Sequence, residues 1–134
     1  MSVSNNLLRR CGTQAKPHIL VVEDEFLIRM MLTEQLREKC YNVTEASNAD
    51  EALSKMTASS PQLIITDVRM PGSMDGIGLL LAVRENLPVL PIIVVSGHLV
   101  SIPKADGCTK FVRKPYSFDA VADTVEKLLD ECTR

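Results

Sequence analysis

Short apolar runs separated by helical patterns constrain the fold of this chain more than any other feature of its sequence. The runs HILVV (18–22), LIIT (63–66) and PIIVV (91–95) are nearly free of polar residues, as expected of strands covered on both faces. Parallel strands need a crossover between them, usually a helix, and the stretches between these runs have helical spacing. The alternation predicts an α/β domain with a doubly wound parallel sheet and helices on both faces.

Two weaker patterns complete the predicted sheet. YNVTEA (41–46) alternates between apolar and polar residues, which is typical of a strand at or near a sheet edge. KFVRK (110–114) is expected to be the last strand, and Pro115 ends it. The sheet is therefore predicted to have five strands.

Helical spacing of apolar residues predicts amphipathic helices with recognisable starts. Asn48 with Glu51 three residues later matches a capping box, Asp75 begins the next helix, and the last helix starts after Ser117. The residues expected on the apolar faces are Ile28, Met31, Leu32 and Leu36; Ala49, Ala52, Leu53 and Met56; Ile77, Leu80, Leu81 and Val83; and Phe118, Val121, Val125, Leu128 and Cys132.

Two segments depart from this regular pattern. Residues 1–16 show no periodicity and are expected to form a flexible tail before a domain over residues 17–134. In segment 97–107, Pro103 lies between two glycines, which predicts a helix of about one to two turns, or one that is partly unwound.

Composition excludes some classes of function. The net charge of −2 argues against a protein dominated by electrostatic binding to nucleic acid. The apolar runs are too short to span a membrane, and the N-terminal stretch lacks the apolar segment of a secretory signal. We therefore expect a cytoplasmic protein without a membrane partner.

Chemically active side chains follow the predicted strands. Glu23 and Asp24 follow the first strand, Asp67 the third, Ser96 the fourth, and Lys114 ends the fifth. Carboxyl ends of parallel strands meet at one edge of the sheet, where ligands bind. Three carboxylates there repel one another and suit a hard cation such as Mg²⁺, while an ammonium suits a phosphoryl oxygen. The set predicts phosphoryl transfer with an aspartyl phosphate.

The motifs VVEDE (21–25), TDVRMPGSMDG (66–76), VVSG (94–97) and FVRKP (111–115) occur in this order. With them the chain resembles the receiver domain of bacterial two-component response regulators, chemotaxis regulators included, over nearly all of residues 17–132. The resemblance implies the flavodoxin-like strand order 2-1-3-4-5.

The resemblance also implies roles at the site. Asp67 would accept phosphate from a histidine kinase or a phosphotransfer protein. Mg²⁺ would be held by Glu23, Asp24, Asp67 and the backbone carbonyl of Arg69. Glu23 stands where the family more often has Asp, which leaves open direct contact with the metal or contact through water. The loop MPGSMDG is one residue longer than the usual family loop.

Three further expectations come with the resemblance. Ser96 and Lys114 would contact the phosphoryl oxygens, and Phe111 would turn inward as a switch when Ser96 moves. The output would pass to a downstream protein target, with a homodimer as a further option. No DNA-binding domain is recognisable in this chain, which leaves open a stand-alone regulator, a phosphate-relay intermediate and a fragment of a longer protein.

Other interpretations compete with this one. A Mg²⁺-dependent phosphatase or phosphotransferase would use the same aspartyl phosphate, but dehalogenase-like enzymes have a second Asp where this chain has Arg69. A receiver-shaped binding module that is never phosphorylated is the other alternative. Individually, Glu23 and Asp24 could serve as helix N-terminal charges, Ser96 as a helix cap, and Phe111 as a core residue.

Overall fold

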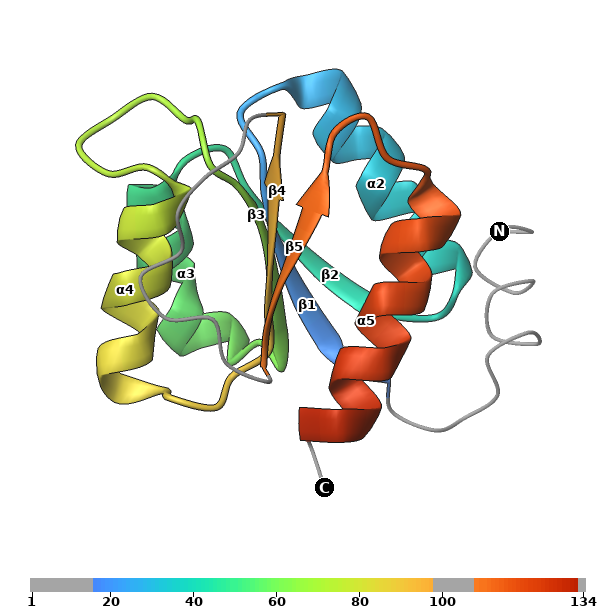
Figure 1. Cartoon of the computed structure of the whole chain (residues 1–134). Coiled ribbons are helices and arrows are strands. Elements are labelled where there is room, and N and C mark those ends of the chain that lie inside the picture. Colours follow the sequence, from blue (N-terminus) through green and yellow to red (C-terminus); the bar gives the residue numbers. More distant parts are fainter. Residues whose placement is uncertain (1–15, 98–107, 133–134) are drawn as a thin grey trace.

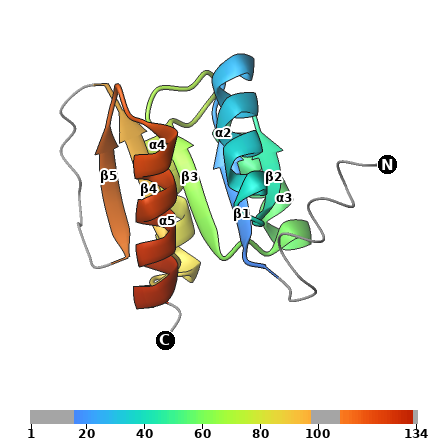
Figure 2. The ribbon, with the colours of Figure 1, turned by 90° about the vertical axis from the view of Figure 1, so that its right-hand side faces the viewer.

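The computed structural model describes residues 16–97 and 108–132, which form a five-stranded parallel sheet between two layers of helices (Figure 1). The strand order β2-β1-β3-β4-β5 confirms the predicted doubly wound fold (Figure 2). Most of the predicted tail and of segment 97–107, with its predicted short helix, lies outside the described residues. The elements are β1 (His18–Val22), α2 (Phe26–Glu38), β2 (Asn42–Ala46), α3 (Ala49–Ser59), β3 (Leu63–Asp67), α4 (Gly76–Asn86), β4 (Ile92–Ser96), β5 (Thr109–Arg113) and α5 (Phe118–Cys132).

Both faces of the sheet are covered, and this accounts for the apolar runs. Helices α2 and α5 lie on one face, and α3 and α4 lie on the other (Figure 1). In β1, Ile19 and Val21 pack in the cluster with α2 and α5, while Leu20 and Val22 pack in the cluster with α3 and α4. Successive side chains of a strand point to opposite faces, so a strand covered twice needs apolar residues at every position.

The helices begin where the sequence predicts. Asn48, Asp75 and Ser117 each accept a hydrogen bond from the backbone N–H three residues later, at 2.7, 2.9 and 3.0 Å. Each bond satisfies one of the amide groups left without a partner at a helix start. Among the residues that the structure describes, no helix combines the length and the apolar character that crossing a bilayer requires.

Two predicted apolar faces are rotated in the structure. Met31 is 48% exposed and Leu81 is 49% exposed, so their assignment to the buried faces of α2 and α4 is wrong. The buried faces instead include Thr33 in α2 and Leu79 in α4. Each helix packs on the sheet with its most deeply buried side chains at the centre of the contact. Met31 is next to the buried Leu32, and Leu81 is next to the buried Leu80, so both lie at the margin of the buried face.

Thr33 is a buried polar residue on a face that packs against the core. It is 1% exposed, and among the described residues its hydroxyl has no hydrogen-bond partner. Thr33→Val keeps the shape of the side chain and removes the unpaired hydroxyl, so we expect a gain of about 1 kcal/mol in the free energy of unfolding. Urea unfolding measures the change. Thr33→Ser keeps the hydroxyl and loses a methyl group, and it should destabilise; equal stability of both variants would contradict the explanation.

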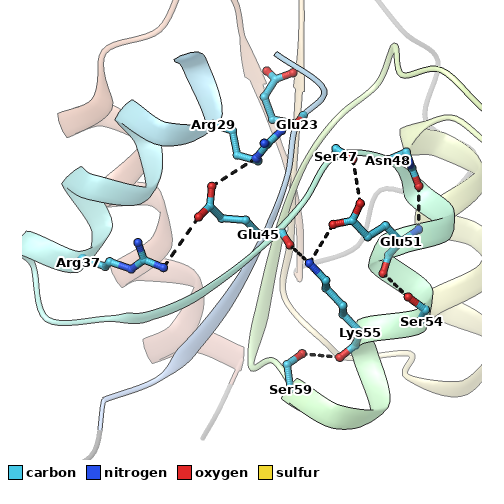
Figure 3. Close-up of polar contacts among 10 residues, drawn as sticks. All are labelled: Glu23, Arg29, Arg37, Glu45, Ser47, Asn48, Glu51, Ser54, Lys55 and Ser59. Atoms are coloured by element: carbon cyan, nitrogen blue, oxygen red, sulfur yellow. Dashed lines mark hydrogen bonds and ion pairs between the residues drawn. The ribbon is translucent and has the colours of Figure 1, made fainter. Parts of the chain in front are cut away.

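Strand β2 forms one edge of the sheet, as its alternating sequence predicts. Cationic side chains from the helices on both faces reach its backbone, and Figure 3 shows the contact from Lys55. Arg37 of α2 donates to the carbonyl of Val43 at 3.1 Å, and Lys55 of α3 donates to the carbonyl of Glu45 at 2.6 Å. Lys55 also pairs with Glu51 Oε1 at 2.8 Å, and the hydroxyl of Ser47 donates to Glu51 Oε2 at 2.8 Å, so both oxygens of Glu51 are bound elsewhere than in the predicted capping box.

Candidate functional site

The structure brings the predicted polar residues to one edge of the sheet. Asp67 is the last residue of β3 and Ser96 the last of β4, while Glu23 and Asp24 follow β1 and Lys114 follows β5. In Figure 1 the carboxyl ends of the strands lie at the top. All five strands are parallel, so their carboxyl ends must meet at this edge.

Asp67 is held by both of its carboxylate oxygens. Oδ1 accepts a hydrogen bond from the backbone N–H of Val68 at 2.8 Å, and Oδ2 accepts one from Lys114 Nζ at 2.9 Å. Burial alone would lower the pKa of Lys114, but the hydrogen bond and charge of Asp67, with the charge of Glu23, raise that pKa on balance. The side chain therefore keeps its positive charge beside the carboxylate.

Glu23 is the most deeply buried acid of the site, with 4% of its surface exposed. Its carboxylate accepts a hydrogen bond from the backbone N–H of Glu25 at 3.2 Å and lies 3.8 Å from Lys114 Nζ. The pKa of Glu23 is raised from 4.5 to about 7, chiefly by burial; Asp24 and Asp67 contribute to the rise, and the Glu25 bond and the charge of Lys114 oppose it. In the folded protein Glu23 therefore exchanges its proton near neutral pH.

This shift makes the stability of the metal-free protein depend on pH. Between 4.5 and about 7 the folded protein binds the Glu23 proton more tightly than the unfolded chain does, so stability falls as pH rises through this window. We expect a loss of about 1–3 kcal/mol between roughly pH 5 and pH 8. Urea unfolding in a chelator measures the slope. Glu23→Gln cannot titrate and should flatten it; an equally steep slope in that variant would assign the effect to another group.

Three carboxylates of the site are close enough to share a cation. One oxygen from each of Glu23, Asp24 and Asp67 lies within 4.8 Å of the others. Two of the residues are buried and Asp24 is exposed, so the cluster opens to solvent on one side. Arg69, whose backbone carbonyl was predicted as a further metal ligand, follows β3 with an exposed side chain. The bond from Glu23 to the N–H of Glu25 lies before α2, and the first turn of α2 has no acidic side chain, so the helix-start interpretation of Glu23 stays a prediction.

Ser96 and Phe111 lie on the two strands beyond Asp67. Ser96 is 5% exposed, and its carbonyl accepts a hydrogen bond from the backbone N–H of Lys114 at 2.8 Å, which ties the end of β4 to the start of the β5–α5 loop. Phe111 pairs in register with Val94 and is partly buried against the core cluster with α3 and α4. This position is compatible with both the packing and the switching interpretation of Phe111.

Sequence reasoning missed Gly76, which begins α4. A Cβ atom on Gly76 would lie 2.0 Å from the carbonyl oxygen of Asp67 and 2.9 Å from the Cα of Val68. The backbone N–H of Gly76 donates to the carbonyl of Val68 at 2.8 Å. The start of α4 is therefore packed directly on the backbone that carries Asp67. A glycine at a helix start that already has an Asp cap is the signal that could have indicated a close approach.

A doubly wound α/β fold with an aspartate and a lysine in contact at its carboxyl edge defines a class of protein that acts on ligands at that edge. The sequence pattern of the response regulator receiver domain matches residues 19–126, and the chain belongs to this family, the phosphorylatable signalling receivers of two-component systems. The predicted family, fold and signalling class are thereby confirmed.

Relatives of known sequence and structure agree with this assignment. The chain is 34% identical to sporulation initiation phosphotransferase F of Bacillus subtilis (strain 168), over 83% of this chain and 92% of that protein. It is 31% identical to the transcriptional regulatory protein DctD of Rhizobium meliloti, over 84% of this chain, but spans only 25% of that protein. Chemotaxis protein CheY4 of Vibrio cholerae superposes with a TM-score of 0.77 at 29% identity, covering 85% of this chain and 99% of that one.

Proposed function

We propose that Asp67 accepts a phosphoryl group from a phosphohistidine of a histidine kinase or phosphotransfer protein. The observation that carries the proposal is the contact between Asp67 Oδ2 and Lys114 Nζ at 2.9 Å, beside a cluster of three carboxylates. A bond forms between a carboxylate oxygen of Asp67 and phosphorus as the phosphorus–nitrogen bond breaks, and the imidazole keeps the electron pair. Lys114 would then neutralise a phosphoryl oxygen, and the hydroxyl of Ser96 would donate to another.

The acidic cluster fits Mg²⁺. The carboxylates of Glu23, Asp24 and Asp67 are hard oxygen donors within 4.8 Å, and the backbone carbonyl of Arg69 follows in the next loop. Burial of Glu23 makes its charged form costly unless a cation compensates it, which supports a metal here. When bound, Mg²⁺ would neutralise these carboxylates and the phosphoryl oxygens.

Exposed apolar side chains support a protein as the phosphoryl donor. Phe26 and Leu27 follow the β1–α2 loop at the site and are 62% and 65% exposed. Because these two apolar side chains are adjacent and lie beside the site, they support contact with another protein there. After phosphorylation, Ser96 and Phe111 would change position and signal to a downstream protein target, with a homodimer as one possible form. Cytoplasmic location, where histidine kinases present their phosphoryl groups, is part of the proposal.

The role of a signalling receiver fits this site better than that of a phosphatase. The position two residues after Asp67, where dehalogenase-like enzymes carry a general acid, holds the exposed Arg69. A guanidinium stays protonated at all physiological pH values and cannot cycle as an acid and base. We therefore propose that the chain supports its own phosphorylation and dephosphorylation without turning over a separate substrate.

Incubation with acetyl phosphate and Mg²⁺ tests the proposal. We expect one phosphoryl group per chain, found by intact-mass measurement and located on Asp67 after peptide mapping. Beryllofluoride with Mg²⁺ should occupy the same site. Steady release of phosphate from small phosphate esters would favour the phosphatase, and a chain that neither acetyl phosphate nor a panel of phosphorylated kinases modifies would favour the unphosphorylated binding module.

A further inference from the structure

Arg29 joins the site loop to the edge of the sheet. It lies in the first turns of α2, and its side chain is only 15% exposed. Its Nη1 donates to the backbone carbonyl of Glu23 at 2.7 Å, and its Nε donates to Glu45 Oε1 at 3.3 Å. Figure 3 shows Arg29 between the carboxylate of Glu45 and the loop that carries Glu23.

The orientation of the guanidinium is fixed from several sides. The group lies 5.6 Å from the centroid of the Phe26 ring, within the range of a cation–π contact. Glu45 is in turn held by β2, where Lys55 binds its backbone carbonyl at 2.6 Å and Arg37 lies 4.0 Å from its carboxylate. A guanidinium fixed in this way holds its Nη1 donor against the carbonyl of Glu23 in the β1–α2 loop.

The carbonyl of Glu23 belongs to the peptide unit that joins Glu23 to Asp24. A peptide unit is planar, so holding its carbonyl sets the direction in which the chain enters Asp24. Glu23 and Asp24 are two of the three acids in the carboxylate cluster. Bonds to charged donors are about twice as strong as neutral ones, so the Arg29 contact is a strong restraint on this plane.

We propose that Arg29 is a positioning residue for the metal site, holding the Glu23–Asp24 peptide so that both carboxylates converge on one cation. The proposal deepens the proposed function and rests on its metal site. Arg29 acts through the main chain and through Glu45. Groups that orient metal ligands in this way commonly change metal affinity by about 10–100-fold when removed.

The sign of the effect separates this role from a simple charge effect. Removing a positive charge next to a cation site lowers the repulsion felt by Mg²⁺, and by itself it tightens binding. Removing a positioning contact loosens the ligands and weakens binding. Arg29→Gln removes both the charge and the contact, so a weaker affinity can only come from lost positioning.

Arg37→Gln is the matched control. It makes the same change of charge and loses a partner of the same Glu45, but Arg37 is half-exposed and binds the carbonyl of Val43 instead of the site loop. Mg²⁺ titration by calorimetry of the unphosphorylated protein, below the melting temperature of each variant, measures the affinity. We expect Arg29→Gln to bind Mg²⁺ at least about tenfold more weakly than the original chain, and Arg37→Gln to stay within about twofold.

Arg29→Lys adds a second discrimination, because it keeps the charge. One ammonium cannot serve the Glu23 carbonyl and the Glu45 carboxylate with the geometry of a planar fork, so we expect a several-fold weaker affinity. Unchanged or tighter Mg²⁺ binding in Arg29→Gln overturns the proposal. If Arg29→Gln does not fold, Arg29→Lys decides, since it leaves the charge unchanged: weaker binding supports the proposal and unchanged binding overturns it. An original chain that binds no Mg²⁺ would instead refute the metal site of the proposed function.

Discussion

Asp67→Asn is expected to abolish phosphorylation of the chain. A carboxylate oxygen of Asp67, whose Oδ2 contacts Lys114 at 2.9 Å, is the proposed nucleophile, and an amide has neither its charge nor its nucleophilicity. The substitution is close to isosteric, and the retained carbonyl oxygen can still accept the bond from the Val68 N–H. Acetyl phosphate with Mg²⁺ should therefore leave the intact mass of Asp67→Asn unchanged, with the fold preserved by circular dichroism.

Asp75→Asn provides a matched control for this loss. Asp75 is an exposed carboxylate at the end of the same β3–α4 loop, where it caps α4 through the Gly78 N–H at 2.9 Å. Asparagine caps helices about as well as aspartate, so this variant should be phosphorylated at nearly the original rate. Undiminished labelling of Asp67→Asn would be incompatible with Asp67 as the acceptor, and loss of labelling in both variants would assign the loss to a general disturbance of the β3–α4 loop.

Gly76→Ala is expected to destabilise the protein strongly, although it adds only one methyl group. In a helix alanine is favoured over glycine by about 1 kcal/mol, which argues for a gain in stability. The added Cβ, however, would lie 2.0 Å from the Asp67 carbonyl oxygen and 2.8 Å from its carbonyl carbon. Backbone atoms cannot move away as a flexible side chain can. We expect a net loss of about 3 kcal/mol or more in urea unfolding, together with slower labelling of Asp67.

Gly78→Ala separates the clash from the general effect of replacing glycine in α4. There the added Cβ would meet the Cγ of Met74 at 2.6 Å, and this long side chain can rotate away. We expect a change in stability within about 1 kcal/mol of zero and normal labelling. Equal stability of Gly76→Ala and Gly78→Ala would show that α4 does not rest on the Asp67 backbone as tightly as described.

Most of the fold follows from the sequence because each strand is a contiguous pattern. The runs at 18–22 and 63–66 are β1 and most of β3, and the alternation at 41–46 correctly marks β2 as an edge strand. The buried faces of the helices are less predictable. Met31 and Leu81 are apolar and correctly spaced, yet they are about half exposed because the rotation of a helix on the sheet depends on its whole set of contacts.

The sequence predicts which residues make up the site, but it does not predict the contacts that hold those residues in place. Parallel strands place Asp67, Lys114 and Glu23 at one edge whatever the details of packing. That Arg29 holds the Glu23 carbonyl, and that Gly76 touches the Asp67 backbone, depends on how the loops after β1 and β3 bend back, which the sequence patterns do not show. Arginines in helices and glycines near loops are too common for sequence alone to single these two out.

The cations along β2 have a consequence for self-association of the chain. The Asn42 N–H and the Ala46 carbonyl bond toward β1, so in the alternating ladder the carbonyls of Val43 and Glu45 face outward. Arg37 and Lys55 occupy these two acceptors. A further strand could extend the sheet here only by displacing both cations. Their side chains would then lose the hydrogen bonds to these carbonyls. The open edge is thereby protected against strand addition and the aggregation it can start, and a homodimer that joins two sheets through β2 is disfavoured.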